Sequence, residues 1–267
     1  VQSGNDASIV VAENISGSER AFTDLMNEYA TKIGMKNSNF VNSSGWPHPH
    51  HYSTMYDLAV LSKAIIRDFP DMYKIYSEKE FTYNNITQPN RNSLLELYEG
   101  TDGLKTGYVK DSGYGIVVST LKKNRRIIIA VNGLESRKSR VIESERLLNW
   151  AFRNTKLETL FKKGEVVKKT DVWLGAKNQI DLIVGQDILT TLKSEQKDSI
   201  DAKIIYDKPI KAPILKNQEI GKIIIEIKDK DTLEFPLYAK DSIKKINPLF
   251  RVFSAIRYLI FGNINND

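Results

Sequence analysis

Apolar positions recur at helical spacing in four stretches of the first 155 residues, which places them on one face of an α-helix in each case. The clearest stripe runs from Ala21 to Ile33; the S-x-x-E capping signal of Ser16-Gly-Ser-Glu19 precedes it, and Gly34 closes it. Loop-forming residues fill the interval from Asn37 to Ser53. The four predicted helices cover residues 6–15, 19–33, 54–69 and 139–153.

A different pattern follows Phe81, where short apolar runs alternate with turn residues. Residues 113–120 and 126–131 predict neighbouring strands that are joined by a polar turn at residues 122–125. Their nearly continuous apolar character indicates central strands covered on both faces. Together with the helices, they predict an α+β domain over residues 1–155, an α/β sandwich in which helices pack on an antiparallel sheet.

The composition changes near Lys156. Beyond it, short Lys-, Ile- and Val-rich runs are separated by Gly, Pro and Asp turns, which is typical of strands in an all-β domain. We therefore predict a small β-sandwich-like domain over residues 156–244, followed by a tail over residues 245–267.

The tail combines an apolar helical pattern with a narrow polar stripe. Pro248 suits a first helical position, and Arg251, Ser254 and Arg257 recur at every third position. The apolar run is about fourteen residues long, short of the roughly 20 that a membrane-spanning helix needs. Residues 245–267 are predicted to form an amphipathic helix that anchors the protein to a membrane surface. The alternative is a terminal helix docked on the protein's own core.

Overall composition narrows the choice of partners and compartment. Hydrophobic residues make up 41% and charged residues 27% of the 267 residues, which is ordinary for a soluble globular protein. The net charge of +6 comes with no Arg-rich tract interleaved with aromatics, so we expect no nucleic acid partner. An anionic lipid surface or cell-wall polymer fits a basic protein better. The absence of cysteine excludes disulfides and thiolate metal sites, and it agrees with a periplasmic location.

Two tripeptides, each present once, carry candidate chemistry. Ser3-Gly-Asn5 precedes a predicted helix, and Lys105-Thr-Gly107 lies just ahead of a predicted strand. In this order they match the second and third motifs of the penicillin-interacting serine hydrolases, whose full set is S-x-x-K, S-x-N and K-T-G. Because a substrate-contacting motif needs folded protein on both sides, we expect Val1 to be an internal cut.

Hydrolysis of a D-alanyl-D-alanine bond at such a site needs a serine activated by a lysine of lowered pKa. Ser3 is the candidate to pass a proton to the leaving amine, and Asn5 is suited to hold the base lysine and the substrate amide. Lys105 would keep the site positive, and Thr106 would offer its hydroxyl to the substrate's terminal carboxylate. Gly107 would leave a strand edge without Cβ, against which the substrate backbone can lie.

The chain resembles, over essentially its whole length, the low-molecular-mass D-alanyl-D-alanine carboxypeptidases, which are penicillin-binding serine peptidases of the bacterial periplasm. The resemblance rests on residues 2–7, 21–27, 75–81, 90–92, 102–107 and 147–150. It implies a penicillin-binding, transpeptidase-like fold and a location on the outer face of the inner membrane. It also implies removal of the terminal D-alanine from peptidoglycan pentapeptide through an acyl-serine, with covalent capture by β-lactams and without a metal or cofactor.

The same resemblance assigns roles to two arginines. It implies that Arg140 binds the substrate carboxylate and that Arg91 lies near the lysine of K-T-G. A guanidinium fork suits a carboxylate, although residue type alone equally fits a solvated arginine in the first turn of a helix.

The chain departs from the family pattern in two places. Family members commonly carry His after K-T-G, where this chain has Tyr108. The S-x-x-K motif has three local matches, at Ser119, Ser194 and Ser242, and all follow K-T-G, where the family's order does not allow the nucleophile. We therefore expect these 267 residues to lack the nucleophile motif and to be inactive by themselves.

Other interpretations stay open from sequence. A non-catalytic muropeptide-binding or scaffold protein on the same fold fits the missing nucleophile. A β-lactamase would need a base to activate water, and no residue is nominated for it. All three histidines fall in residues 47–51, which we interpret as an exposed loop on the rim of the cleft because no Cys, Asp or Glu lies at ligand spacing.

Overall fold

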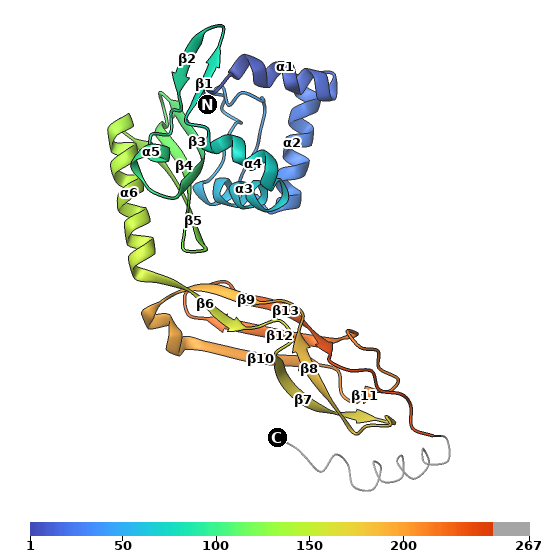
Figure 1. The fold of residues 1–267 in the computed structure, drawn as a ribbon. Helices are drawn as coiled ribbons and strands as arrows, with labels where there is room; N and C mark the ends of the chain where they lie inside the picture. Colours follow the sequence, from blue (N-terminus) through green and yellow to red (C-terminus); the bar gives the residue numbers. More distant parts are fainter. Residues whose placement is uncertain (248–267) are drawn as a thin grey trace. The chain divides into compact units, whose positions relative to one another are not determined.

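The computed structural model describes residues 1–247, and the chain divides into two compact units, residues 1–153 and a second unit that begins at residue 154 (Figure 1). Residues 248–267, which hold most of the predicted anchor helix over residues 245–267, lie outside the described residues. Among residues 1–247, no helix has both the length and the apolar character that crossing a bilayer requires.

The first unit contains the four predicted helices. They are α1 (Asn5–Ser16), α2 (Glu19–Ile33), α3 (Met55–Asp68) and α6 (Arg137–Asn154). Shorter elements connect α3 to the sheet; they are α4 (Pro70–Tyr73), the 3-10 helix η1 (Lys74–Ser77), the hairpin of β1 (Glu80–Tyr83) and β2 (Ile86–Pro89), and α5 (Leu94–Leu97).

The helix α2 covers the predicted residues 19–33, but its N-terminal cap differs from the one that the sequence signal indicated. Its cap is Ser18, whose Oγ accepts a hydrogen bond of 3.2 Å from the Ala21 amide. Ser16 instead ends α1, and Gly17 follows it with φ 76°, the left-handed conformation that commonly closes a helix. The capping signal at Ser16 was therefore wrong because that residue is still part of the preceding helix.

A three-stranded antiparallel sheet forms the middle of this unit, in the order β3–β4–β5. Its strands are β3 (Thr101–Val109), β4 (Gly113–Lys122) and β5 (Arg125–Leu134). The two predicted strands are β4 and β5, but only β4 is central, since β5 is an edge strand of the sheet that residues 1–153 form. The Lys105-Thr-Gly107 motif lies ahead of β4, as predicted, and is itself part of a strand, β3, which the sequence pattern did not predict.

Both faces of the sheet are covered. Successive residues of β4 point to opposite sides, so each face packs against a different part of the unit. Ile116 and Val118 pack with Leu148 of α6 on one side. Val117 packs on the other side, in a cluster that Leu58 of α3 joins. Figure 1 shows α6 and α3 on opposite sides of the strands.

The second unit, described as far as residue 247, is all-β apart from one 3-10 helix. Its elements are β6 (Thr155–Phe161), β7 (Val166–Trp173), β8 (Gln179–Val184), β9 (Ile188–Lys193), η2 (Ser194–Ser199), β10 (Ile200–Tyr206), β11 (Ile210–Lys211), β12 (Glu219–Ile227) and β13 (Leu233–Ala239). Six strands pair in the order β10–β12–β13–β8–β7–β11, and β6 pairs with β9. Isoleucine, leucine and valine side chains fill the core between them, with Leu182, Ile225 and Leu237 fully buried.

Candidate active site

Ser3 and Lys105 are 102 positions apart in the sequence and meet in the structure. Lys105 Nζ donates a hydrogen bond of 3.0 Å to Ser3 Oγ, and it donates another to the Thr106 carbonyl. An ammonium group has donors only, so the Ser3 hydroxyl proton stays available to a third group. The two residues therefore place a hydroxyl beside a fixed cation on the outer edge of β3.

The segment before α1 is held in this position by the β1–β2 hairpin. Gln2 Nε2 donates a hydrogen bond of 2.5 Å to the carbonyl of Pro89, which ends β2. Ser3 itself has φ 58°, in the left-handed region that a serine seldom adopts. Such strain costs about 1 to 3 kcal/mol and is typical of functional sites.

Two arginines stand close to Lys105 and make the site strongly positive. Burial lowers the pKa of Lys105, and the neighbouring Arg91 and Arg140 lower it further. The lysine is nevertheless exposed along the outer edge of β3, so the desolvation of its ammonium group is only partial. Within residues 1–247, no ion pair joins any of these three cations to a carboxylate. An unpaired cluster of like charges is the electrostatic pattern of an anion-binding site.

Arg140 projects from α6 and is almost entirely buried, with 6% of its surface exposed. Its Nη2 donates a hydrogen bond of 3.2 Å to the Arg91 carbonyl, and its guanidinium carbon lies 6.0 Å from the centre of the Tyr114 ring. Burial, followed by the charge of Arg137, lowers the pKa of Arg140. The burial of Arg140 excludes the alternative that residue type left open, a solvated arginine in the first turn of a helix.

Asn92 lies in the segment 90–92 that carries the family resemblance, but the sequence assigned no role to it. It is 2% exposed, its Nδ2 donates to the Gly103 carbonyl at 3.0 Å, and its Oδ1 accepts from the Leu94 amide at 3.2 Å. These bonds tie the loop that carries Arg91 to β3, two positions before Lys105. The sequence gives no signal for this, because burial of an asparagine next to an arginine cannot be recognised from residue type.

The start of β3 is fixed by a second polar contact. Arg126 of β5 donates two hydrogen bonds of 2.7 Å to the Asp102 carboxylate, and Tyr73 Oη donates to the same carboxylate at 2.6 Å. The ion pair is largely shielded, with 24% and 29% of the two side chains exposed. Hydrogen bonds to charged groups in such surroundings are among the stronger ones, so they support the register of β3.

The outer edge of β3 is open where the motif lies. Lys105 and Gly107 are exposed, whereas Thr106 between them is buried, with 7% of its surface exposed. A Cβ added to Gly107 would meet no atom within 4 Å, so this glycine is not required for packing. Tyr108 is 59% exposed and stacks on Tyr114 with ring centres 4.4 Å apart. The proposed contact of the Thr106 hydroxyl with a carboxylate stays a prediction.

Asn5 opens α1 and is exposed two positions after Ser3. Its side-chain amide makes no hydrogen bond within residues 1–247. The amide is therefore free to bind another group, and its assignment as a catalytic residue stays a prediction.

The three Ser-x-x-Lys serines belong to other elements of the structure than Ser3 and Lys105. Ser119 of β4 is fully buried, and its Oγ accepts a hydrogen bond from Arg126. Ser194 begins η2 in the second unit, and Ser242, also in the second unit, accepts a hydrogen bond from the Lys216 amide. None of these hydroxyls contacts Lys105 within the described part of the chain.

The histidine loop at residues 47–51 is largely exposed, with His51 half-buried. His51 Nδ1 accepts a hydrogen bond of 3.3 Å from the Val41 amide, and its pKa is lowered by burial and then by His48. Across residues 1–247, no group of three or more His, Asp or Glu side chains is placed to hold a metal ion.

Comparison with known families decides the identity of both units. Residues 1–136 match the D-alanyl-D-alanine carboxypeptidase family, and residues 156–245 match the C-terminal domain of penicillin-binding protein 5. The chain belongs to the D-alanyl-D-alanine carboxypeptidase family. The penicillin-binding fold predicted from the motifs, with an all-β domain after it, is thereby confirmed.

Individual members of the D-alanyl-D-alanine carboxypeptidase family agree with this. DacA of Haemophilus influenzae is 39% identical over 234 residues, which are 86% of this chain and 60% of that relative. DacD of Escherichia coli is 38% identical over 245 residues, 91% of this chain and 63% of that relative. The chain thus spans a little over 60% of the length of the relatives it matches.

Solved structures of penicillin-binding proteins share the fold. Penicillin-binding protein 5 from Haemophilus influenzae superposes with a TM-score of 0.78 at 37% identity, over 91% of this chain and 72% of that one. Penicillin-binding protein D2 from Listeria monocytogenes, solved in the cefotaxime-bound form, gives a TM-score of 0.53 at 29% identity, over 56% of this chain and 62% of that one.

Proposed function

We propose that residues 1–155 supply part of the active site of a serine-type D-alanyl-D-alanine carboxypeptidase, which removes the terminal D-alanine from peptidoglycan pentapeptide through an acyl-serine. The observation that carries this proposal is the 3.0 Å hydrogen bond from Lys105 to Ser3, in the field of Arg91 and Arg140. A hydroxyl fixed beside a cation suits proton transfer to a leaving amine. Unpaired cations suit a substrate that ends in a carboxylate.

Each part of the site has its own role in the proposed reaction. Substrate backbone lies along the open edge of β3, where Gly107 leaves room, and the terminal carboxylate is directed to Arg140 and Thr106. Ser3 donates its hydroxyl proton to the amine nitrogen of the departing D-alanine as the C–N bond breaks, and regains a proton from the base that deprotonated the acylating serine. Lys105 holds the Ser3 oxygen and stabilises negative charge that develops during attack. A β-lactam, which presents an amide and a carboxylate, is the matching covalent inhibitor.

The nucleophile is not assigned to any serine of residues 1–247, because the three Ser-x-x-Lys matches lie elsewhere. The 267-residue chain taken alone should therefore form no acyl-enzyme. Incubation with a fluorescent penicillin, followed by denaturing electrophoresis, checks this: we expect no covalent label. Labelling of one site per molecule would show that one of the serines present is the nucleophile.

Binding of the substrate's carboxylate can be tested without turnover. The 267-residue chain is titrated with an N-acylated peptide that ends in D-Ala-D-Ala, and with the same peptide as its C-terminal amide, by isothermal calorimetry. We expect the acid to bind at least about tenfold more tightly, a difference of about 1.4 kcal/mol.

Two variants on the same helix sharpen this test. Arg140→Gln should remove the preference for the acid, whereas Arg146→Gln should preserve it, because Arg146 is exposed and pairs with Glu143. Equal affinity of the normal chain for acid and amide would contradict the proposed carboxylate site.

We also infer a periplasmic location on the outer face of the inner membrane, held by residues 245–267. The basis is the sequence pattern of that tail and the lysines at its start, Lys244 and Lys245, which form no ion pair within residues 1–247. Flotation of the full chain with phosphatidylglycerol vesicles, against phosphatidylcholine, tests it. Replacing Lys244 and Lys245 by Gln should weaken binding about tenfold or more. Unchanged binding of this variant, or equal binding to both lipids, would contradict the inference.

A matched control uses two lysines of the same unit. Lys203 and Lys222 pair with Glu226 and Glu234 across neighbouring strands, so their charge is already neutralised. Replacing both by Gln should leave vesicle binding unchanged.

A further inference from the structure

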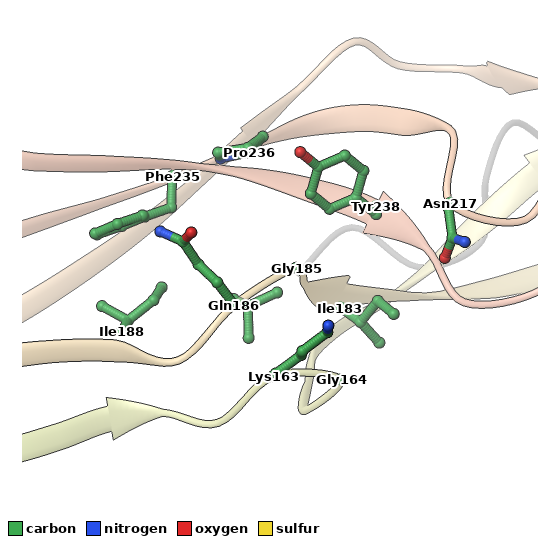
Figure 2. Close-up of a pocket in the computed structure, with 11 residues that line it drawn as sticks. Lys163, Gly164, Ile183, Gly185, Gln186, Ile188, Asn217, Phe235, Pro236 and Tyr238 are labelled. Atoms are coloured by element: carbon green, nitrogen blue, oxygen red, sulfur yellow. The ribbon is translucent and has the colours of Figure 1, made fainter. Parts of the chain in front are cut away.

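A cavity of about 420 Å³ is formed entirely by residues of the second unit. Figure 2 shows it between β13 on one side and two chain segments, around Lys163 and around Gln186, on the other. Its volume falls within the range of ordinary small-molecule sites, about 300 to 1,000 Å³.

The cavity exists because two paired strands separate. Residues 182–184 of β8 pair with residues 237–239 of β13, and beyond Val184 the chain leaves β13 to form β9. The Tyr238 ring lies directly on Gly185, where an added Cβ would come within 2.6 Å of the ring. Pro236, at the open stretch of β13, has no N–H to offer, so an added peptide strand cannot complete the ladder there.

The lining combines apolar surface with a few polar groups. Ile183, Ile188 and Phe235 supply apolar walls. Gln186 and Asn217 supply amides that can donate and accept hydrogen bonds. The Gln186 side chain reaches across the space towards Phe235 in Figure 2.

The one charged side chain in the lining is Lys163. The nearby Asp187 carboxylate accepts the Lys163 backbone amide at 2.8 Å, and the Lys163 ammonium forms no ion pair within residues 1–247. A cationic group in a concave site with no acidic lining residue favours an anionic ligand. An acyl chain, by contrast, would bury the two amides and the ammonium without partners.

We propose that this cavity binds a sugar acid: an N-acetylated amino-sugar with a free carboxylate, as in peptidoglycan glycan from which the stem peptide has been removed. The apolar face of a pyranose ring fits against Phe235 and Tyr238, its hydroxyl and acetamido groups fit the amides of Gln186 and Asn217, and its carboxylate fits Lys163. The choice of peptidoglycan as the source of the sugar rests on the proposed function. The second unit would then hold a peptide-free stretch of glycan while the first acts on a peptide.

The probe is the disaccharide of N-acetylglucosamine and N-acetylmuramic acid, titrated into the 267-residue chain and followed by two-dimensional NMR. The side-chain amide signals of Gln186 and Asn217 should shift with one dissociation constant. N,N′-diacetylchitobiose, which has the same kind of rings without the carboxylate, should bind about five- to tenfold more weakly.

Adjacent lysines provide matched variants. Lys163→Gln should weaken the acid about five- to tenfold, to the level of the neutral sugar, and leave the neutral sugar unchanged. Lys162→Gln should change neither, since Lys162 is not part of the lining. The proposal is overturned if neither sugar shifts these signals at about ten millimolar. It is equally overturned if both lysine variants weaken the acid to the same extent.

The disaccharide titration and the D-Ala-D-Ala titration can succeed or fail independently. The disaccharide carries no peptide, so its failure to bind leaves the D-Ala-D-Ala titration unaffected. A failed D-Ala-D-Ala titration would in turn leave the sugar titration interpretable.

Discussion

Lys105, Arg91 and Arg140 are three like charges close enough to shift the pKa of the lysine. They come from three different elements: the strand β3, the loop that Asn92 ties to β3, and a buried position on α6, from which Arg140 donates a hydrogen bond to the Arg91 carbonyl. Holding cations together without a counter-ion is unfavourable, so the arrangement makes physical sense only with an anionic ligand.

The pKa of Lys105 provides a test of this cluster. Arg91→Gln removes one neighbouring cation, so the protonated lysine is less disfavoured and the Lys105 pKa should rise towards 10.5, although burial, the larger cause, remains. NMR titration of the lysine side-chain nitrogen measures it. Arg67→Gln, at an exposed arginine of α3 paired with Asp68, is the control and should leave the value unchanged. An unchanged pKa in Arg91→Gln would mean that Arg91 is not near Lys105.

The same shift predicts how stability depends on pH. The folded pKa of Lys105 lies below its unfolded value of 10.5, so the unfolded chain binds more protons in the interval between the two. The free energy of unfolding should therefore rise with pH across that interval, and less steeply in Arg91→Gln.

Asn92 is the residue whose replacement should cost most stability near the site. Asn92→Ala leaves the Gly103 carbonyl and the Leu94 amide buried without partners, so we expect a loss of about 2 to 4 kcal/mol in urea unfolding. Gln88→Ala, at an exposed amide of β2, should change stability by less than about 0.5 kcal/mol. Equal losses of stability in the two variants would contradict this role of the Asn92 hydrogen bonds.

At this scale the sequence predicts some site residues and misses others. Ser3 and Lys105 stand in recognisable tripeptides, and the structure brings their side chains together. Arg140 was nominated only through the family resemblance, since its burial is set by tertiary packing. Asn92 was missed because its role depends on a backbone carbonyl eleven residues away, which no local pattern reports.

At the scale of elements, β3 is the strand that assembles the site. It carries the lysine, pairs with β4 on one side and leaves its other edge open within residues 1–153. Two glycines in it have different surroundings: a Cβ at Gly103 would lie 2.7 Å from Tyr73 Oη, whereas a Cβ at Gly107 would meet nothing within 4 Å. One glycine therefore serves packing and the other keeps the edge clear.

Alanine substitution should separate these two roles. Gly107→Ala should change the free energy of unfolding by less than about 1 kcal/mol and weaken binding of the D-Ala-D-Ala peptide about tenfold, because the new methyl group stands on the open edge. Gly103→Ala should instead cost about 1 to 3 kcal/mol of stability, because the Tyr73 ring must move. Calorimetry and urea unfolding of both variants check this, and unimpaired binding by Gly107→Ala would contradict the placement of substrate along β3.

Helices were easier to predict from the sequence than this strand. The apolar stripes of α2 and α3 are long and periodic, and their predicted positions are confirmed. β3 has polar residues and two glycines where a buried strand would show apolar residues. The sequence pattern therefore predicts a strand only after these residues. The nearly continuous apolar sequence of β5 is typical of a central strand, but within the first unit only one of its edges is paired.

At the scale of the whole molecule, each unit has a core of its own. Leu148 is fully buried among residues of the first unit, and Ile225 is fully buried among strands of the second. The change of composition near Lys156 indicated an all-β part in the sequence. The cavity beside Tyr238 was beyond sequence reasoning, because it arises where β8 and β13 separate.

Separate cores predict separate responses to core substitutions. Leu148→Ala and Ile225→Ala should each cost about 2 to 5 kcal/mol, and hydrogen exchange should show the lost protection in the substituted unit only. Mass spectrometry of amide exchange resolves the two units. Loss of protection across both units from either substitution would show that they fold as one.

The central claim is that the amino-terminal segment and β3 line one cleft for a peptide that ends in a carboxylate. The most direct measurement is a single NMR titration of the 267-residue chain with the D-Ala-D-Ala acid, following the Lys105 side-chain nitrogen and the Ser3 backbone amide together. We predict that both signals shift with the same dissociation constant, while the Lys163 side-chain signal stays fixed. A response at only one of the two residues, or at neither, would contradict the account.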